Sequence, residues 1–101
     1  MIEELIRSIK SNDINKIKIL YNNLQEIIDI AKENEVLEIK VEYFIDNLFN
    51  DIIKKFNKLS NKKYEIEVNS LQEFLILLIE NKINLDYKVK VGEDYDYKWI
   101  L

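Results

Sequence analysis

The sequence predicts one α+β domain in which three N-terminal helices precede a β-α-β-β unit with a small, at least partly antiparallel three-stranded sheet. Apolar residues recur at helical spacing through residues 1–60, and they alternate with charged residues in three later stretches. The chain has 101 residues, 48% of them hydrophobic, which is enough for one core. We therefore expect a single domain over residues 1–101, with a helical part (1–60) and a β-α-β-β part (63–101).

The first two helices are separated by a polar turn. Ile2 to about Lys10 carries apolar residues on one helical face, and the sequence Ser11-Asn12-Asp13 then interrupts the pattern. All three turn residues are good N-caps, because a short polar oxygen can accept a free backbone N–H of the first helical turn. A second helix is expected from Ile14 to about Glu33.

The stretch VLEIKVEYF, residues 36–44, fits two periods. Its apolar residues alternate with charged ones as in a strand, and they also continue the helical stripe that runs on to Leu59. A strand would need a turn before residue 46, and no Gly, Pro or Asn is present there. We favour one helix over 35–59, capped by Asn34. Ile39 and Tyr43 then lie off its main face, so they need cover from the C-terminal part or from a partner.

The last third of the chain alternates between the two periods. Strands are expected at Tyr64–Val68, Leu85–Val91 and Tyr95–Leu101. Ser70-Leu71-Gln72-Glu73 is a capping-box sequence that opens an apolar helix from Leu71 to Asn81. Gly92-Glu93-Asp94 is expected to be a turn, with Gly92 at a positive φ.

The composition excludes most catalytic chemistry. The chain has no Cys and no His, and its single Gly excludes glycine-rich phosphate-binding loops. The serines have no His to activate them, and the carboxylate pairs on the expected strands face solvent rather than a cleft. We expect a protein that is not an enzyme and that holds no cofactor and no metal.

Negative charge gathers near the C-terminus. The net charge is −4, and residues 64–101 hold eight acidic and four basic side chains. The sequence GEDYDYKW, residues 92–99, combines acids with Tyr and Trp, which are enriched at binding hot spots. If the strands are adjacent, further acids extend this surface. The expected partner-binding residues are Glu93, Asp94, Tyr95, Asp96, Tyr97, Glu65, Glu67 and Asp86. The alternative is that the aromatic residues face the core and the acids form only a turn.

A second charged cluster has the opposite sign. Its members are Lys54, Lys55, Lys58, Lys62 and Lys63. Lysines at the end of a helix stabilise its dipole, and the alternative is a patch that contacts phosphates. The acidic total and the absence of a nucleic-acid-binding motif favour the first interpretation.

These observations predict a small acidic binding protein. The expected function is a phage-type inhibitor, similar in kind to anti-CRISPR proteins, that blocks a basic nucleic-acid-binding enzyme such as a nuclease or CRISPR effector. The alternatives are an immunity protein that neutralises a toxin nuclease, and a self-associating structural or regulatory module, such as a homodimer. Nucleic acid and membranes are not expected partners.

The sequence also indicates a source and a location. Ile, Lys and Asn have A/T-rich codons and are abundant, which favours a low-GC bacterium or its phage. No signal peptide and no apolar run of about 18 residues is present, so we expect a soluble cytoplasmic protein.

Overall fold

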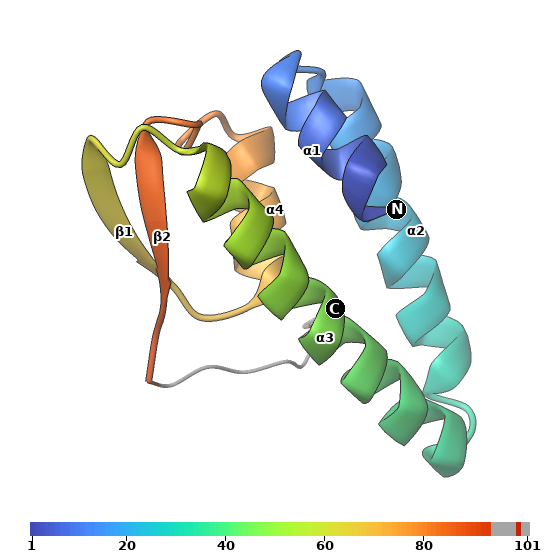
Figure 1. The fold of residues 1–101 in the computed structure, drawn as a ribbon. Helices are drawn as coiled ribbons and strands as arrows, with labels where there is room; N and C mark the ends of the chain where they lie inside the picture. Colours follow the sequence, from blue (N-terminus) through green and yellow to red (C-terminus); the bar gives the residue numbers. More distant parts are fainter. Residues whose placement is uncertain (94–98, 100–101) are drawn as a thin grey trace.

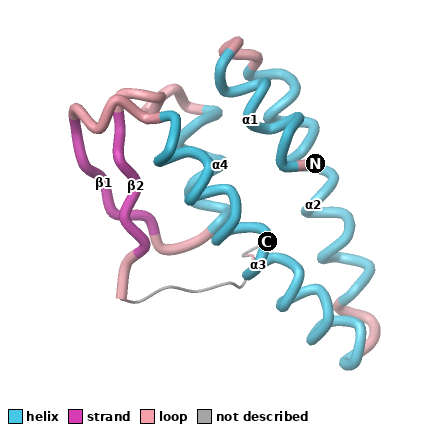
Figure 2. The backbone as a smooth tube through the Cα atoms, in the orientation of Figure 1, coloured by secondary structure: helices cyan, strands magenta, loops and turns pink. Residues whose placement is uncertain are grey.

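The fold consists of three N-terminal helices followed by a β-α-β unit with a two-stranded parallel sheet (Figures 1 and 2). The computed structural model describes residues 1–93 and residue 99. The elements are α1 (Ile2–Lys10), α2 (Ile14–Ala31), α3 (Glu35–Leu59), β1 (Tyr64–Val68), α4 (Leu71–Ile79) and β2 (Tyr87–Val91). Helices α2 and α3 form a long hairpin whose free end projects away from the sheet (Figure 1).

Polar caps fix where the helices begin. The Asp13 carboxylate accepts a hydrogen bond from Lys16 N–H at 3.3 Å, and the Asn34 side chain accepts one from Leu37 N–H at 3.1 Å. The Ser70 hydroxyl accepts from Glu73 N–H at 3.1 Å, as its capping-box sequence predicts. Each cap satisfies a backbone donor that has no partner inside its own helix.

Residues 36–43 are helical, so the strand alternative is wrong for them. The Asn34 cap and the acidic first turn of α3, with Glu35 and Glu38, start the helix in the way that the helix dipole favours. Further along α3, Ile45 is buried and continues the core stripe.

The core lies where the four helices and the inner face of the sheet meet. Its largest fully buried side chains are Phe49 and Phe56 of α3 and Phe74 of α4. The rings of Phe56 and Phe74 pack edge to face, with centroids 5.3 Å apart. This contact joins the α2–α3 hairpin to the β-α-β unit.

The sheet has one inner and one outer face. Val68 of β1 and Val89 of β2 are buried, and Tyr64 pairs with Tyr87 in the register of the two strands. The tyrosine rings lie 5.2 Å apart between centroids. Because side chains alternate along a strand, the charged residues of both strands share the outer face.

Polar side chains at the C-terminal end of α3 and in its capping residue occupy the edge of β2 that faces away from β1. The Asn57 amide donates to the Val89 carbonyl and accepts from the Val89 N–H, both at 2.7 Å. The Ser60 hydroxyl donates to the Tyr87 carbonyl at 2.5 Å. These side chains form hydrogen bonds with the backbone groups of β2 that a third strand beside it would need.

The expected antiparallel third strand therefore has no place at this edge of β2. Most of its residues, 94–98 and 100–101, lie outside the described part of the chain. Trp99 is described, and it is not in a strand. The sheet formed by the described residues is parallel, because α4 returns the chain to the same end before β2 begins.

Trp99 packs instead on α2. Its indole N–H donates to the Gln25 side chain at 2.5 Å, and its ring lies 4.9 Å from that of Tyr21 between centroids. The side chain is buried. Trp99 is thus anchored to the helical hairpin.

Gly92 does not have a positive φ, so the predicted conformation is wrong, and its lack of a side chain leaves room for Asn69. No glycine has a positive φ, and Gly92 N–H donates to the Val68 carbonyl at 3.1 Å. A Cβ at Gly92 would lie 1.8 Å from the Asn69 side-chain oxygen. Any side chain here would have to displace Asn69.

The variant Asn57→Ala should be destabilised by about 2–3 kcal/mol, because it leaves the buried N–H and carbonyl of Val89 without partners. Urea unfolding followed by circular dichroism measures this loss. The matched control is Asn50→Ala, at an exposed position of the same helix. Both variants replace Asn by Ala, so both gain the same intrinsic helix propensity. If both variants have the same unfolding free energy, Asn57 does not hold the edge of the sheet.

The variant Trp99→Ala should lose about 3–5 kcal/mol of unfolding free energy, since a large buried ring is removed. The exposed aromatic Tyr43 is the control, and Tyr43→Ala should change stability by no more than about 0.5 kcal/mol. A loss below about 1 kcal/mol for Trp99→Ala would show that the indole is not part of the core.

Candidate functional site

The acids of β1 do not form the acidic surface that the sequence predicts. Glu65 lies opposite Lys88 and Glu67 lies opposite Lys90 in the register of the parallel strands. Oppositely charged cross-strand neighbours attract each other, so this face of the sheet is close to neutral. The sequence alone could not show this pairing, because it depends on strand direction.

Asp86 and Glu93 lie at opposite ends of β2. They are seven residues apart, which corresponds to about 23 Å along an extended strand. The Asp86 carboxylate accepts from the Asn61 amide at 2.9 Å, and its carbonyl accepts from Lys63 N–H and Tyr64 N–H. Asp86 thus holds the start of the sheet together. Glu93 is exposed, and Asp94, Tyr95, Asp96 and Tyr97 lie outside the described residues.

The largest local excess of negative charge in the described structure lies at the free end of the α2–α3 hairpin. Residues 26–46 hold seven acidic and two basic side chains, a net charge of −5. Since the whole chain carries −4, the remaining residues sum to +1. This excess is not seen when charges are summed separately for each third of the sequence, because residues 26–46 span the boundary between the first and the second third.

Three of these acids lie along one face of α3. Glu38, Glu42 and Asp46 follow each other at intervals of four residues, so they rise by about 6 Å from one to the next. We call the surface formed by these three carboxylates with Ile39 and Tyr43 the acidic face. Asp46 takes part in a further interaction within the protein.

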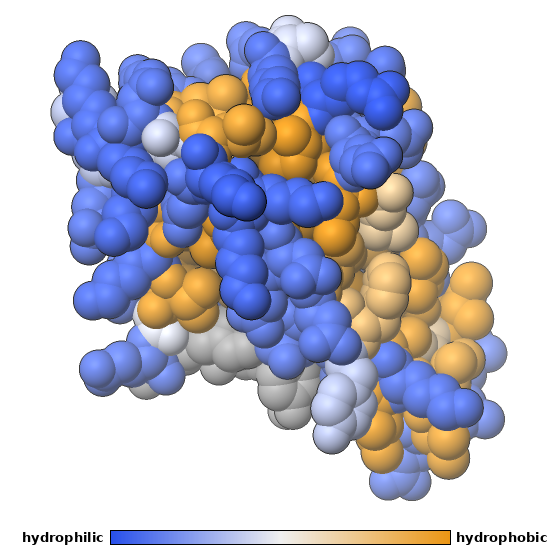
Figure 3. Space-filling view, in the orientation of Figure 1, coloured by the Kyte–Doolittle hydropathy of each residue, from blue (hydrophilic) through white to orange (hydrophobic). Residues whose placement is uncertain are grey.

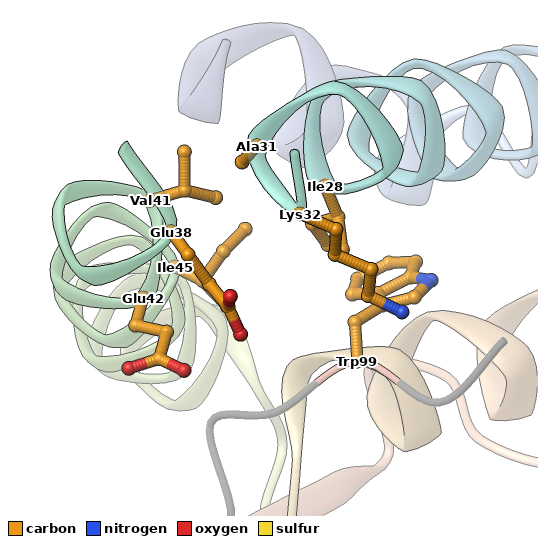
Figure 4. A pocket seen from close by; sticks show the side chains of 8 residues that line it. All are labelled: Ile28, Ala31, Lys32, Glu38, Val41, Glu42, Ile45 and Trp99. Atoms are coloured by element: carbon orange, nitrogen blue, oxygen red, sulfur yellow. The ribbon is translucent and has the colours of Figure 1, made fainter. Parts of the chain in front are cut away.

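A cavity of about 180 Å³ opens between α2 and α3 beside the acidic face (Figure 4). Its apolar wall includes Ile28 of α2 and Val41 and Ile45 of α3, and Trp99 closes the side toward the β-α-β unit. Glu38 and Glu42 lie at its border, and Lys32 lines the opposite side. The lining thus combines apolar area, an indole ring and a net negative charge.

A second cavity, of about 300 Å³, lies on the acidic face itself. It is lined by Ile39, Glu42, Tyr43 and Asp46. Ile39 is 50% exposed and Tyr43 is 69% exposed. Trp99 does not line this cavity. The expectation that Ile39 and Tyr43 need cover from the C-terminal part or from a partner stays a prediction, since residues 94–98 and 100–101 lie outside the described part.

Few of the described charges are paired within the chain. Among residues 1–93 and 99, one ion pair is present, between Lys82 and Glu80 at 2.8 Å. In the same residues, no group of three or more His, Cys, Asp or Glu side chains could hold a metal ion. No helix in this part of the chain is long and apolar enough to cross a membrane.

The lysine cluster gathers at the other end of α3. A cavity of about 550 Å³ is lined by Lys54, Lys55, Asn57, Lys58, Lys62 and Lys88. Lys63 points elsewhere, with its ammonium 5.5 Å from the centroid of the Tyr64 ring. Lys88 joins the cluster from β2, which the sequence did not indicate. Helix α3 therefore carries acids at its N-terminal end and lysines at its C-terminal end, which is the arrangement that the helix dipole favours.

The sequence did contain the signal for the acidic face. Ile39 and Tyr43 lie off the apolar stripe of α3, and acids follow at helical spacing on the same side. In comparisons with protein-family models, curated proteins and solved structures, none matches this chain.

Proposed function

We propose that this protein is a non-enzymatic binding module that recognises a basic protein surface through the acidic face of α3. The observation that carries the proposal is the row of Glu38, Glu42 and Asp46 beside the exposed side chains of Ile39 and Tyr43. An exposed aromatic ring among carboxylates suits Arg and Lys side chains, which bring both an aliphatic stem and a positive charge.

Electrostatics favours a cation at this position. Like charges four residues apart on a helix destabilise it by about 0.2–0.5 kcal/mol per pair. A bound guanidinium or ammonium group between Glu38 and Glu42 removes this repulsion and adds charge-assisted hydrogen bonds. Tyr43 adds a cation–π contact at the rim. The net charge of −5 over residues 26–46 also steers a basic partner toward this end of the molecule.

This surface supports the role of an inhibitor of a nucleic-acid-binding enzyme. Carboxylates held in a row can occupy the Arg and Lys positions that otherwise bind phosphates. The role of a phage-type, anti-CRISPR-like inhibitor and that of an immunity protein against a toxin nuclease use the same contacts. They differ in the partner, which the binding experiment below can be extended to identify.

A fluorescein-labelled nona-arginine peptide is a suitable probe for the acidic face, and its anisotropy reports binding. Wild-type protein should bind it, and affinity should fall steeply between low and high salt. The variant Glu38→Gln/Glu42→Gln should bind at least tenfold more weakly, a loss of about 1.4 kcal/mol. Trp99 provides a second signal, because it is the single tryptophan and lines the adjoining cavity.

The matched control removes two other carboxylates from the surface. Glu65→Gln/Glu67→Gln should change affinity by less than about twofold, since Lys88 and Lys90 already balance these charges. If this control loses as much affinity as the α3 variant, binding depends on total charge and not on the acidic face. Steep salt-dependent binding of duplex DNA by the wild type would instead favour the lysine cluster as the functional surface.

The physiological partner can then be sought by affinity capture from a low-GC bacterium with the same three proteins. A protein retained by the wild type and by the Glu65/Glu67 control, but lost with the Glu38/Glu42 variant, is a target of the acidic face. A further variant, with Glu93, Asp94 and Asp96 all changed to Lys, tests the C-terminal acids that the sequence predicts. If the target is lost with this variant but retained by the Glu38/Glu42 variant, the binding site lies in the C-terminal segment and not on the acidic face.

A further inference from the structure

The hairpin has a second exposed surface, on the side where α1 packs and beyond the end of α1. Helix α1 packs against both α2 and α3. At one edge, Met1 and Glu4 line a cavity with Leu20 and Asn23 of α2. At the other edge, Ile6 and Arg7 line one with Lys55 of α3. Figure 1 shows that the N-terminus lies about halfway along α2, so α1 covers only part of the hairpin.

The faces that α1 covers continue toward the free end of the hairpin. On α2, Ile27 follows Leu20 by seven residues, and Ile30 follows Asn23 by seven. On α3, Leu48 precedes Lys55 by seven residues and is buried. Phe44 precedes Leu48 by four and Leu37 precedes Phe44 by seven, so they share its face. We call the surface of Ile27, Ile30, Leu37 and Phe44 the open groove.

The residues of the open groove are exposed despite their apolar character. Their exposed fractions range from 37% for Ile27 to 59% for Ile30, with Leu37 at 40% and Phe44 at 42%. Figure 3 shows hydrophobic residues gathered over this end of α2 and α3. Contiguous apolar area of this kind on a folded protein marks an interaction site.

The open groove differs from the acidic face in charge. The row of Glu38, Glu42 and Asp46 lies on another side of α3, together with Ile39 and Tyr43. On the side of Leu37 and Phe44, Lys40 lies three residues after one and four before the other. On the side of Ile30, Glu26 lies four residues before it and Glu33 three after it. Charges of both signs therefore border the open groove, whereas the acidic face carries carboxylates alone.

We infer that the open groove binds one amphipathic helix of a partner protein, placed in line with α1 and packed between α2 and α3. Helix α1 shows what this groove accepts: a helix with apolar residues at Ile2, Leu5, Ile6 and Ile9. The partner helix should present the same spacing, with an acidic residue near Lys40 and basic residues near Glu26 and Glu33.

The size of the groove favours a single helix over a second copy of the chain. Four partly exposed side chains provide far less than the roughly 800 Å² per partner that a standard protein interface buries. A helix of about 12 residues, which is about 18 Å long, spans the uncovered part. The inference goes beyond the proposed function, because it concerns another face of the hairpin and another kind of ligand.

The probe is an 18-residue peptide with Leu at helical spacing on one face and equal numbers of Glu and Lys elsewhere, which gives it no net charge. A peptide of the same composition in scrambled order is its control. Titration into ¹⁵N-labelled protein, followed by NMR, should shift the amides around Ile27, Ile30, Leu37 and Phe44. Binding should be saturable for the amphipathic peptide and absent for the scrambled one.

The variant Leu37→Ala/Phe44→Ala should weaken this binding at least tenfold. Ile39→Ala/Tyr43→Ala is the matched control, with two apolar residues removed from the acidic face of the same helix, and should weaken it less than about twofold. Circular dichroism checks that both variants fold. Absence of saturable binding, or shifts confined to the acidic face, would overturn the inference. So would a concentration-dependent dimer that the Leu37→Ala/Phe44→Ala variant abolishes, because a second copy would then cover the groove.

Discussion

The double hydrogen bond between the Asn57 side chain and the backbone of Val89 constrains the arrangement of the whole chain. It satisfies a buried donor and a buried acceptor at the edge of β2, where a sheet would otherwise continue. Among the described residues the sheet has two strands, and α3 is fixed along the edge of β2. Trp99 packs on α2, where its indole lines the cavity beside the hairpin.

Fixing one end of α3 leaves its other end free. The sheet, α1 and α4 pack against α3, and all of its buried residues except Ile45 lie in its C-terminal half. The N-terminal half packs against α2 and leaves apolar and acidic side chains in solvent. A stable protein usually buries such apolar residues, so their exposure at one end favours recognition as their role. The two faces of the hairpin present different chemistry, one acidic and aromatic, the other apolar.

The charge distribution follows the same division. The acidic end lies at the helix N-terminus and the lysine cluster at its C-terminus, which stabilises α3 through its dipole. Placing the charges at the poles also gives the molecule a strong electrostatic asymmetry that the modest net charge of −4 conceals. This asymmetry favours approach of the basic partner that we propose toward the hairpin.

The sequence by itself determined the helices, their caps and the position of both strands in the described part. Apolar spacing and short polar caps are local properties, so Asn34 and Ser70 could be identified without knowledge of the fold. For α2 the sequence offered Ser11, Asn12 and Asp13, and the structure shows that Asp13 is the cap. Strand direction and the partners of surface charges are not local. Only the tertiary structure placed Lys88 and Lys90 beside Glu65 and Glu67, and only it showed that Asn57 occupies the edge of β2. The row of acids on α3 is local and follows from helical spacing, but only the tertiary structure showed that Ile39 and Tyr43 beside it are exposed and that Trp99 lines the adjoining cavity.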